Sequence, residues 1–330
     1  MEPVTVSDHA KDVMNAALVW DMTLPWEPEA IDDITLPRFK AAGVDLVSLT
    51  VSMPTLDGTM RHIAAVQAHL RKHADTMVLI RSVDDVMEAR KAGKLGITFN
   101  LQETNPLDGD LAMIEVYYQL GVRHMLMAYN QKNRVGDGCA ERTDAGLSRF
   151  GVRVVEEMNR VGMLVDGTHT GYRTTMDAME VASAPFIFSH CNAWSVFPHY
   201  RNIRDDQIKA CAATGGVIGV NGLGEFLDDP RATSASIFRH LDHMVQLVGP
   251  THVGLGLDYV KNTGWFWNWL RDNPEMWPEI DGKPHVDTDF AQPEQIAELC
   301  ELMLKHQYAE DDIHAILGGN FTRVAREVWK

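Results

Sequence analysis

The sequence contains little cysteine and no long apolar run. Its four cysteines, Cys139, Cys191, Cys211 and Cys300, are scattered over 330 residues without a C-x-x-C spacing. This arrangement predicts neither a disulfide framework nor a thiolate zinc site, and it favours buried free thiols in a reducing cytoplasm. No stretch approaches the roughly 18 consecutive apolar residues of a membrane span, and the N-terminus opens with an acidic residue instead of a basic region. We therefore expect a cytoplasmic protein with no signal peptide and no membrane partner.

Positive charge is also scarce. The chain has 30 Lys and Arg residues against 46 Asp and Glu residues, which gives a formal net charge of −16. Such a surplus of acid repels phosphate backbones and anionic lipid headgroups, so nucleic acid is not expected as a partner. The hydrophobic fraction of 45% is typical of a folded globular protein and permits a large core.

The common nucleotide and hydrolase motifs are missing as well. The sequence holds no P-loop, no G-x-S-x-G elbow and no H-E-x-x-H helix, and no G-x-G-x-x-G follows the first expected strand. The GLGE segment at residues 222–225 is too short to be a nucleotide fingerprint. These absences argue against an open, doubly wound dinucleotide-binding sheet.

What the sequence does contain is an alternation of short apolar runs with longer amphipathic stretches. Such runs, rich in Val, Ile and Leu, are typical of a parallel sheet that is buried on both faces. Strands are expected at residues 17–22, 46–51, 77–80, 97–101, 124–127, 163–165, 186–189, 217–220 and 253–257. Helices are expected at 58–72, 110–120, 149–161, 173–181, 205–213 and 236–248, with two or three more in the tail at 293–330, interrupted by the GGN of residues 318–320.

This alternation predicts an α/β fold, a (β/α)8 TIM barrel. The nine expected strands are one more than a barrel needs, and the extra one is assigned to residues 77–80, because the helix SVDDVMEARKAG follows that run without a polar loop. The length alone suggests two domains at about 150 residues each, but no linker or composition break divides the chain. We expect a single domain over residues 1–330, with C-terminal helices from about residue 292 packed on the barrel.

Polar side chains follow four of the expected strands. They are Gln102 and Glu103, His169, His190 and Asp258. The chemistry of such barrels lies at the carboxyl ends of the strands, so these side chains are expected to meet there. Two imidazoles with an acid and an amide or second acid form a set of metal ligands, which could hold a divalent ion with an open position for water.

Other interpretations of single residues stay open. His9, His62, His69, His73, His240, His243, His285 and His314 are interpreted as ordinary surface or core histidines without partners. Asp258 could instead cap the segment that follows it, and Arg201 could form an ion pair at a helix start. The run WFWNWLRDNPEMWP, at residues 265–278, is interpreted as packing of a long loop or a subunit contact, or as a lid that adds apolar and cation-binding surface to a pocket.

Several phrases of the sequence together resemble the renal (membrane) dipeptidase family of zinc metallopeptidases. They are LGVRHMLMAYNQKN, VDGTHTG, PFIFSHCNAW, HYRNIRDDQI, HVGLGLDY and LGGNFTRVAREVW, in this order, from about residue 96 to the C-terminus. The resemblance implies an amidohydrolase-like (β/α)8 barrel with two zinc ions. It also implies hydrolysis of dipeptides, including some with a D-residue or dehydro-residue at the C-terminal position.

Four residues match the site that the resemblance implies. His169 and His190 correspond to the two histidines that hold one of the family's metals. Asp258 corresponds to the aspartate that handles the proton, and Arg201 to the arginine that binds the substrate carboxylate.

The other half of the implied site departs from the family. The family's first strand ends in a His-x-Asp metal pair, whereas here it reads VWDMTLPW and offers only Asp21 or Thr23. Gln102 replaces the glutamate that bridges the two metals, and the adjacent Glu103 is expected to point to the opposite face of the strand. Tyr129 replaces a substrate-contacting histidine and could donate to the developing oxyanion.

These departures predict zinc or another divalent metal at one ion per chain instead of two, because two imidazoles and one carboxylate cannot neutralise two dications. The expected function is a metal-dependent hydrolase, a dipeptidase that cleaves a dipeptide or a similar small amide with metal-activated water. Alternatives are hydrolysis of another metabolite, namely a non-peptide amide, a lactone or a cationic compound, and a non-catalytic binding protein with a decayed metal site. The resemblance and the aromatic run favour a homodimer.

Overall fold

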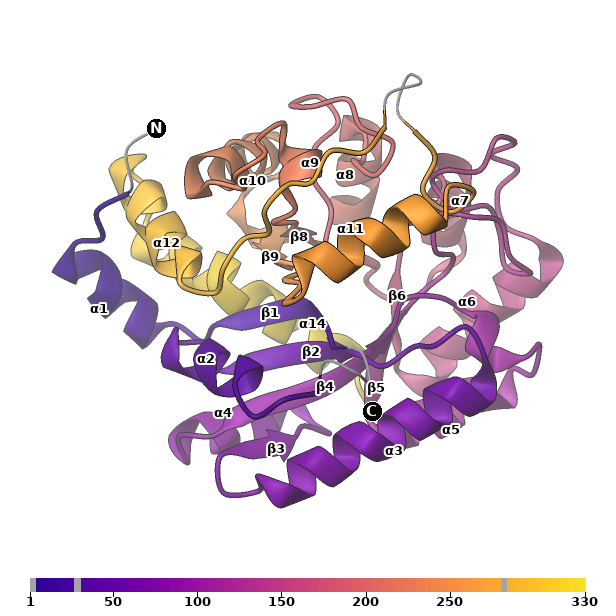
Figure 1. The fold of residues 1–330 in the computed structure, drawn as a ribbon, viewed down its shortest axis with the longest axis horizontal. Helices are drawn as coiled ribbons and strands as arrows, with labels where there is room; N and C mark the ends of the chain where they lie inside the picture. The colour runs from indigo at the N-terminus through magenta and orange to yellow at the C-terminus, as the bar shows by residue number, and fades with distance from the viewer. Residues whose placement is uncertain (1–3, 27–30, 280–283) are drawn as a thin grey trace.

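The computed structural model describes residues 4–26, 31–279 and 284–330, and its centre is a closed parallel barrel (Figure 1). Eight strands close the barrel, and they pair in the order β1, β2, β4, β5, β6, β7, β8 and β9, with β9 returning to β1. Their bounds are β1 Trp20–Pro25, β2 Leu46–Thr50, β4 Leu95–Leu101, β5 Val122–Leu126, β6 Leu164–Asp166, β7 Ile187–Phe188, β8 Val217–Val220 and β9 Val253–Leu255. The predicted (β/α)8 architecture is therefore confirmed.

The ninth strand, β3 (Met77–Leu79), pairs with β4 alone and takes no part in closing the barrel. It contacts the first residues of β4, Leu95 to Ile97, while β5 pairs with the later residues of the same strand. The sequence identified this run correctly as the extra strand. The first strand was placed too early, because β1 begins at Trp20 and continues to Pro25.

The barrel strands are apolar because helices cover their outer faces while side chains fill the interior. All seven residues of β4 are buried, as expected for a strand with no solvent-facing side. The covering helices of the first half are α2 Thr35–Ala41, α3 Leu56–Lys72, α4 Val83–Lys91, α5 Ala112–Leu120, α6 Arg149–Val161 and α7 Tyr172–Val181. Those of the second half are α8 Asp205–Ala213 and α10 Ser234–Val248, whereas α9 Gly224–Leu227 and α11 Thr263–Asp272 belong to the segments that follow β8 and β9.

Local signals define the helix ends well. The side chains of Ser7, Thr55, Ser82, Ser148 and Thr233 each accept a backbone N–H at the start of a helix, as N-cap residues do. Ser82 also forms a capping box with Asp85. The bounds predicted for α6 and α8 agree with the structure at both ends.

The N-terminal and C-terminal helices pack against each other and cover one end of the barrel. The N-terminal helix α1 (Asp8–Ala16) contacts α12 (Gln295–Lys305) and α13 (Glu310–His314), and α14 (Asn320–Val328) follows a π-helical turn at Ala315–Gly319. The predicted break is present at Gly318, where an added Cβ would lie 2.4 Å from the carbonyl oxygen of Leu18. Phe321 of α14 packs against Trp20 of β1 with ring centroids 6.1 Å apart, so the tail covers the amino end of the first strand.

The tryptophan-rich run forms a helix, α11, and the expectation of a long loop was wrong. The side chain of Asn262 accepts the N–H of Trp265 at 3.0 Å and so caps the helix at its start. In the helix, Phe266, Trp267 and Leu270 face the core, while Trp265 remains 41% exposed. The alternation of tryptophans therefore distributes them over different faces of one helix.

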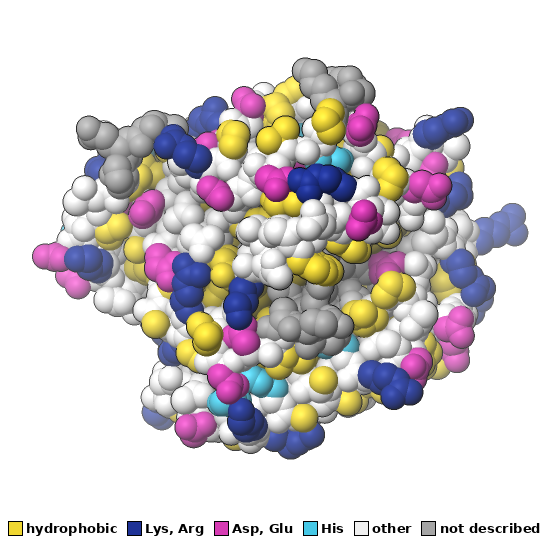
Figure 2. All heavy atoms as spheres, in the orientation of Figure 1, with side chains coloured by type: hydrophobic (Ala, Val, Ile, Leu, Met, Phe, Trp, Pro, Cys, Tyr) yellow, Lys and Arg dark blue, Asp and Glu magenta, His cyan; other side chains and the backbone are white. Residues whose placement is uncertain are grey.

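Charges of both signs are interspersed over the face in Figure 2, with histidine side chains among them. Within the described part of the chain, no helix is both long enough and apolar enough to span a membrane.

Candidate active site

A cavity of about 510 Å³ lies among the loops that follow the strands. Predicted site residues from four segments line it, namely Gln102, Glu103, Tyr129, His169 and Asp258. The structure therefore brings the polar strand ends together, as the barrel topology predicts. Aromatic side chains form much of the remaining wall, and they are Trp26, Trp265, Phe266, Trp269 and Trp277.

Three predicted site residues do not line this cavity. His190, Arg201 and Asp21 are 0%, 2% and 0% exposed, and they lie within the packed part of the barrel. These three side chains therefore lie behind the residues that form the cavity wall, and they contact the site from there.

His169 follows β6 and adopts a left-handed backbone conformation with φ of 62°. A non-glycine residue adopts this conformation only when its surroundings hold it there. Its Nδ1 lies 2.7 Å from Oδ1 of Asn130, which is an acceptor, so Nδ1 carries the proton and Nε2 is left as a lone-pair donor. The Tyr129 ring stacks on the imidazole with centroids 4.0 Å apart and an interplanar angle of 20°.

His190 follows β7 and is completely buried. Its Nδ1 lies 3.0 Å from Oγ1 of Thr23 and 2.8 Å from Oγ of Ser189. Its Nε2 is buried and has no hydrogen-bond partner among the described residues. A buried ring nitrogen without a hydrogen-bond partner lowers the free energy of unfolding, and such a group is available to bind a ligand.

Both imidazoles are neutral in this environment. Burial is the main cause, and with the positive charge of Arg201 it holds the pKa of His169 and of His190 well below the ordinary value. The two rings lie edge to face with centroids 5.2 Å apart. Neutral imidazole is the form that binds a metal ion, so both rings are in the correct state for that role.

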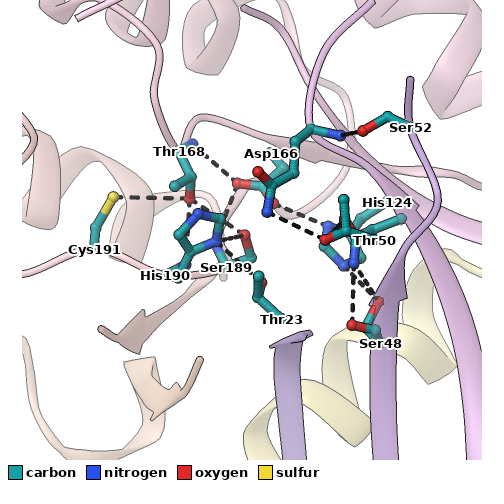
Figure 3. A network of polar contacts seen from close by, with 12 residues as sticks. Thr23, Ser48, Thr50, Ser52, His124, Asp166, Thr168, Ser189, His190 and Cys191 are labelled. Atoms are coloured by element: carbon teal, nitrogen blue, oxygen red, sulfur yellow. Dashed lines mark hydrogen bonds and ion pairs between the residues drawn. The ribbon is translucent and has the colours of Figure 1, made fainter. Parts of the chain in front are cut away.

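A buried chain of polar contacts connects Gln102 to His190 through the barrel interior. Figure 3 shows the part of it that includes Thr50, Asp166 and His190. On the β2 and β4 side, Nε2 of Gln102 donates to Thr50 at 3.2 Å, and Thr50 donates to Asn100 at 3.0 Å. Asn100 in turn donates to Oγ of Ser48 at 3.1 Å. This part of the chain fixes the amide of Gln102 with its nitrogen towards Thr50.

The chain continues across β5 to β7. His124 lies 2.9 Å from Ser48 through Nε2 and 2.9 Å from Asp166 through Nδ1. Asp166 also accepts the backbone N–H of Ser189 at 3.1 Å, and Ser189 contacts His190. Burial acts to raise the pKa of Asp166, but its interactions with His124, His190 and Ser189 together lower it. The network therefore holds the imidazole of His190 in place through the contact between its Nδ1 and Ser189.

The backbone around Ser189 is packed too tightly for side chains on its neighbours. A Cβ added at Gly219 or Gly256 would lie 2.1 Å or 1.9 Å from the carbonyl oxygen of Ser189. Glycine is therefore required at both positions, so that the strands on this side of the barrel can approach each other closely.

Three carboxyl groups near the site have raised pKa values. Burial raises the pKa of Asp258 to about 6, and that of Glu103 to about 7. Burial also raises the pKa of Asp21 to about 7, although its Oδ1 accepts the backbone N–H groups of Leu257 and Thr23. Asp258 lies in the cavity wall, where its Oδ2 accepts a hydrogen bond from Asn221 at 3.1 Å.

Glu103 does not point away from the site as expected. The strand β4 ends at Leu101, so the strict alternation of side chains no longer applies at residues 102 and 103. Gln102 and Glu103 both line the cavity. The site therefore contains a carboxyl group beside the amide that replaces the family's glutamate.

Arg201 is buried in the segment between β7 and α8. Its guanidinium carbon lies 5.1 Å above the ring of Phe226, and its Nε and Nη2 find no acceptor in the described structure. A buried cation with two unpaired donors is suited to an anionic group such as a carboxylate.

The interior offers the ring nitrogens of His169 and His190 and the amide of Gln102 as candidate metal donors. Among the described residues, one set of three His, Cys, Asp or Glu side chains has ligand atoms within 4.8 Å of one another, and it is Asp33, His69 and His73, outside the barrel interior. His169 and His190 therefore have no acidic third ligand at that spacing. Two neutral ring nitrogens, with Gln102 as an uncharged further donor, suit a single ion.

Sequence reasoning missed the residues that hold the two imidazoles. Asn130 follows Tyr129 directly, and Thr23, Ser189 and Asp166 are single polar residues in otherwise apolar strand segments. A polar residue inside a buried strand could have indicated such a role, but its partner depends on strand pairing. The expectation that eight histidines lack partners was also wrong. A carboxylate contacts His9, His69, His73, His243 and His285, and a backbone group contacts His62, His240 and His314.

Comparisons with known proteins identify relatives of this chain. The family model for membrane dipeptidase (peptidase family M19) matches residues 14–273. An uncharacterized dipeptidase of Schizosaccharomyces pombe is 30% identical over 280 residues, which cover 82% of this chain and 62% of that protein. A dipeptidase of Claviceps purpurea is 27% identical, covering 82% of this chain and 60% of that protein. The chain thus spans about three fifths of the length of these curated relatives.

Solved structures of high similarity cover nearly the whole chain. An amidohydrolase from Pseudomonas aeruginosa is 28% identical with a TM-score of 0.86, covering 97% of this chain and 99% of that one. A metallopeptidase from Rhodobacter sphaeroides, liganded with a phosphinate mimic of the dipeptide L-Ala-D-Ala, is 19% identical with a TM-score of 0.76. It covers 95% of this chain and 99% of that one, and at this identity it supports the fold alone.

Proposed function

Because the chain belongs to the membrane dipeptidase family, we propose that it is a metal-dependent hydrolase that cleaves the amide bond of a dipeptide or a similar small amide. The observation that supports this most is a neutral imidazole, His169, and a carboxyl group with raised pKa, Asp258, in the wall of one cavity. The curated relatives from Schizosaccharomyces pombe and Claviceps purpurea are named as dipeptidases, which agrees with this substrate class.

The proposed cofactor is zinc or another divalent ion, at one per chain, held by His169 and His190 with Gln102 as a further donor. Such an ion, when bound, supplies a Lewis acid that makes water reactive at neutral pH. His169 contributes Nε2 because its Nδ1 is committed to Asn130. His190 contributes the Nε2 that has no partner in the described part of the protein.

Asp258 is the proposed proton carrier. With a pKa of about 6 it is largely ionised at neutral pH, so it can accept a proton from the attacking water. The water oxygen bonds to the carbonyl carbon, the C–N bond breaks, and Asp258 returns the proton to the leaving amine. Tyr129 is placed over His169 and is proposed to donate to the developing oxyanion. Arg201 is proposed to pair with the substrate carboxylate through its unpaired guanidinium donors.

A second candidate substrate is a small cationic compound, which the aromatic wall favours. Tyr129 packs against Trp269 and Trp277 with ring centroids 6.5 Å and 5.9 Å apart. Faces of such rings attract cations, and the carboxyl groups of Glu103 and Asp258 line the same cavity. This interpretation keeps the cavity and changes the substrate class.

A cytoplasmic location and a homodimer remain predictions.

The test begins with metal analysis of protein purified without added metal. Hydrolysis is then measured on a panel of dipeptides with an L- or D-residue at the C-terminal position, with and without Zn²⁺. We expect about one ion per chain in His73→Gln, in which the Asp33, His69 and His73 set outside the barrel cannot add a further ion, and metal-dependent turnover that His169→Ala abolishes. His240→Ala is the matched control, because His240 is also a buried histidine but lies on α10 and accepts the N–H of Ala193.

Three outcomes would contradict parts of the proposal. Two ions per chain in His73→Gln, with rapid turnover, would show that the first metal position of the barrel interior is intact. An ion-loaded protein that hydrolyses no dipeptide but binds tetramethylammonium at the cavity would favour the cationic candidate. Absence of both turnover and binding would favour the non-catalytic alternative.

A further inference from the structure

Asp33, His69 and His73 form a cluster on the outside of the barrel that the proposed reaction does not use. His69 lies in the last turn of α3, His73 is the residue that caps the end of this helix, and Asp33 precedes α2. Their ligand atoms all lie within 4.8 Å of one another. Two histidines four residues apart lie on one face of a helix, which is a common way of presenting two ligands to one ion.

The distances suit one ion after small adjustments. Oδ1 of Asp33 lies 2.9 Å from Nε2 of His73 and 3.8 Å from Nδ1 of His69. Ligand atoms in a tetrahedral zinc site are about 3.3 Å apart, given bonds of about 2.0 Å. One distance must therefore lengthen and the other must shorten, each by about half an ångström. The imidazole rings are already near each other, with centroids 4.5 Å apart and an interplanar angle of 34°.

The surroundings favour a cation at this place. The side chain of His69 is only 7% exposed, and the neutral form of an imidazole is the one that binds a metal ion. The Nε2 of His69 is buried and unpaired within the described structure, so no internal hydrogen bond holds the ring away from a ligand on its other side. The carboxyl end of a helix also carries partial negative charge, which attracts cations.

The ammonium group of Lys72 already pairs with one of the two carboxylate oxygens of Asp33. Nζ of Lys72 lies 3.1 Å from Oδ2 of Asp33, but the two histidines face the other oxygen, Oδ1. The lysine can therefore remain while an ion binds at Oδ1. Asp33 and His73 are 59% and 24% exposed, so an ion can reach them from solvent. Figure 2 shows histidine side chains at the surface beside acidic and basic ones.

We propose that Asp33, His69 and His73 bind a divalent transition-metal ion of the zinc type, at a site separate from the barrel interior. The ion joins the start of α2 to the end of α3. Asp32, next to Asp33, accepts the backbone N–H of Thr35 at 2.6 Å and Nζ of Lys261 at 2.6 Å. Because Lys261 lines the cavity, the ion fixes a segment that reaches the cavity rim.

The test counts ions and follows their coordination in the full chain. Wild-type protein freed of metal is titrated with Co²⁺, and visible absorption reports tetrahedral coordination. We expect His73→Gln and Asp33→Asn each to lose one ion per chain, and His190→Ala to retain this ion. In thermal unfolding, saturating Zn²⁺ is expected to raise Tm by at least about 2 °C in His190→Ala but not in a His73→Gln, His190→Ala double variant.

The matched control is His243→Gln. Nε2 of His243 lies 2.9 Å from Asp205, the same distance as between His73 and Asp33, but the described residues offer no second imidazole there. This variant should keep the full ion count. Equal ion counts and equal Zn²⁺-induced Tm shifts in wild type and His73→Gln would overturn the proposal. Because the count is independent of hydrolysis, this result is separate from the outcome for the barrel interior.

Discussion

The two sides of the cavity are built from the same kind of strand end but carry different groups. The side of β6, β7 and β9 supplies His169, His190 and Asp258, which the resemblance to the membrane dipeptidase family predicts as site residues. The side of β1 and β4 supplies Thr23 and Gln102. Both are uncharged, so they cannot neutralise a metal ion as acidic ligands do. In the structure, Thr23 has become a hydrogen-bond partner of His190, and Gln102 is held by Thr50. One side thus carries the two proposed imidazole ligands, whereas the other offers the uncharged donor Gln102 and a hydroxyl group, that of Thr23, which contacts His190.

The largest effect is expected on the ligand side, from Asp258→Asn. Asparagine can still accept the hydrogen bond from Asn221, but it cannot accept a proton. Loss of general acid and base catalysis costs about 10²- to 10⁴-fold in rate, so kcat should fall by at least about 100-fold with little change in metal content. The measurement is steady-state hydrolysis of the best dipeptide. Turnover within about threefold of wild type would assign the proton transfer to another group, with Glu103 the next candidate.

His190→Ala should remove metal binding in the interior and also destabilise the fold. The hydroxyl groups of Thr23 and Ser189 lose a buried partner, which costs about 1–3 kcal/mol in the free energy of unfolding. Metal analysis and urea unfolding measure the two effects. The control His240→Ala removes another buried imidazole and should lower stability without a loss of metal. Loss of metal in both variants would mean that general loosening, not ligand removal, is the cause.

Asp21→Asn tests the side of β1 and β4 through the pH dependence of stability. The pKa of Asp21 is raised from 3.8 to about 7 by burial. The stability that its protonated form contributes is fully present below 3.8, the pKa of Asp21 in the unfolded chain. It is lost as pH rises through about 7, the pKa of Asp21 in the folded protein. Between about pH 5 and pH 7.5, wild type should therefore lose on the order of 3 kcal/mol relative to Asp21→Asn.

Chemical unfolding at a series of pH values measures this difference. Asparagine keeps an acceptor for the N–H groups of Leu257 and Thr23, so the fold should be preserved. Asp12→Asn, at an exposed position of α1, serves as the control and should follow wild type. Parallel stability curves for wild type and Asp21→Asn would show that Asp21 is ionised throughout this range.

The smallest effect is expected from restoring one acid, with Gln102→Glu. A carboxylate at this place adds a charged donor next to the cavity and should tighten Zn²⁺ binding by about tenfold. Isothermal titration measures the change. The control Gln119→Glu adds the same charge at an exposed position of α5 and should leave the affinity unaltered. Weaker binding in Gln102→Glu would indicate that its hydrogen bond to Thr50 matters more than its charge.

The sequence by itself determined the barrel, its extra strand and the five polar residues that meet in the cavity. These features are local: an apolar run of given length, a cap such as Ser82, or a polar residue directly after a strand. The parallel barrel then brings strand ends together whatever the details of packing. For the same reason, the bounds of α6 and α8 could be predicted from periodicity and end signals.

Only the tertiary structure decided the partners of those residues and the position of side chains near strand ends. The contacts of His190 with Thr23, and of His169 with Asn130, join segments separated by 167 and 39 residues. Glu103 reached the cavity because β4 ends at Leu101, and the tryptophan run became α11 because Asn262 caps it. Such contacts depend on register and on which strand lies beside which. The sequence therefore specified which groups the site contains, whereas packing decided what each of them contacts.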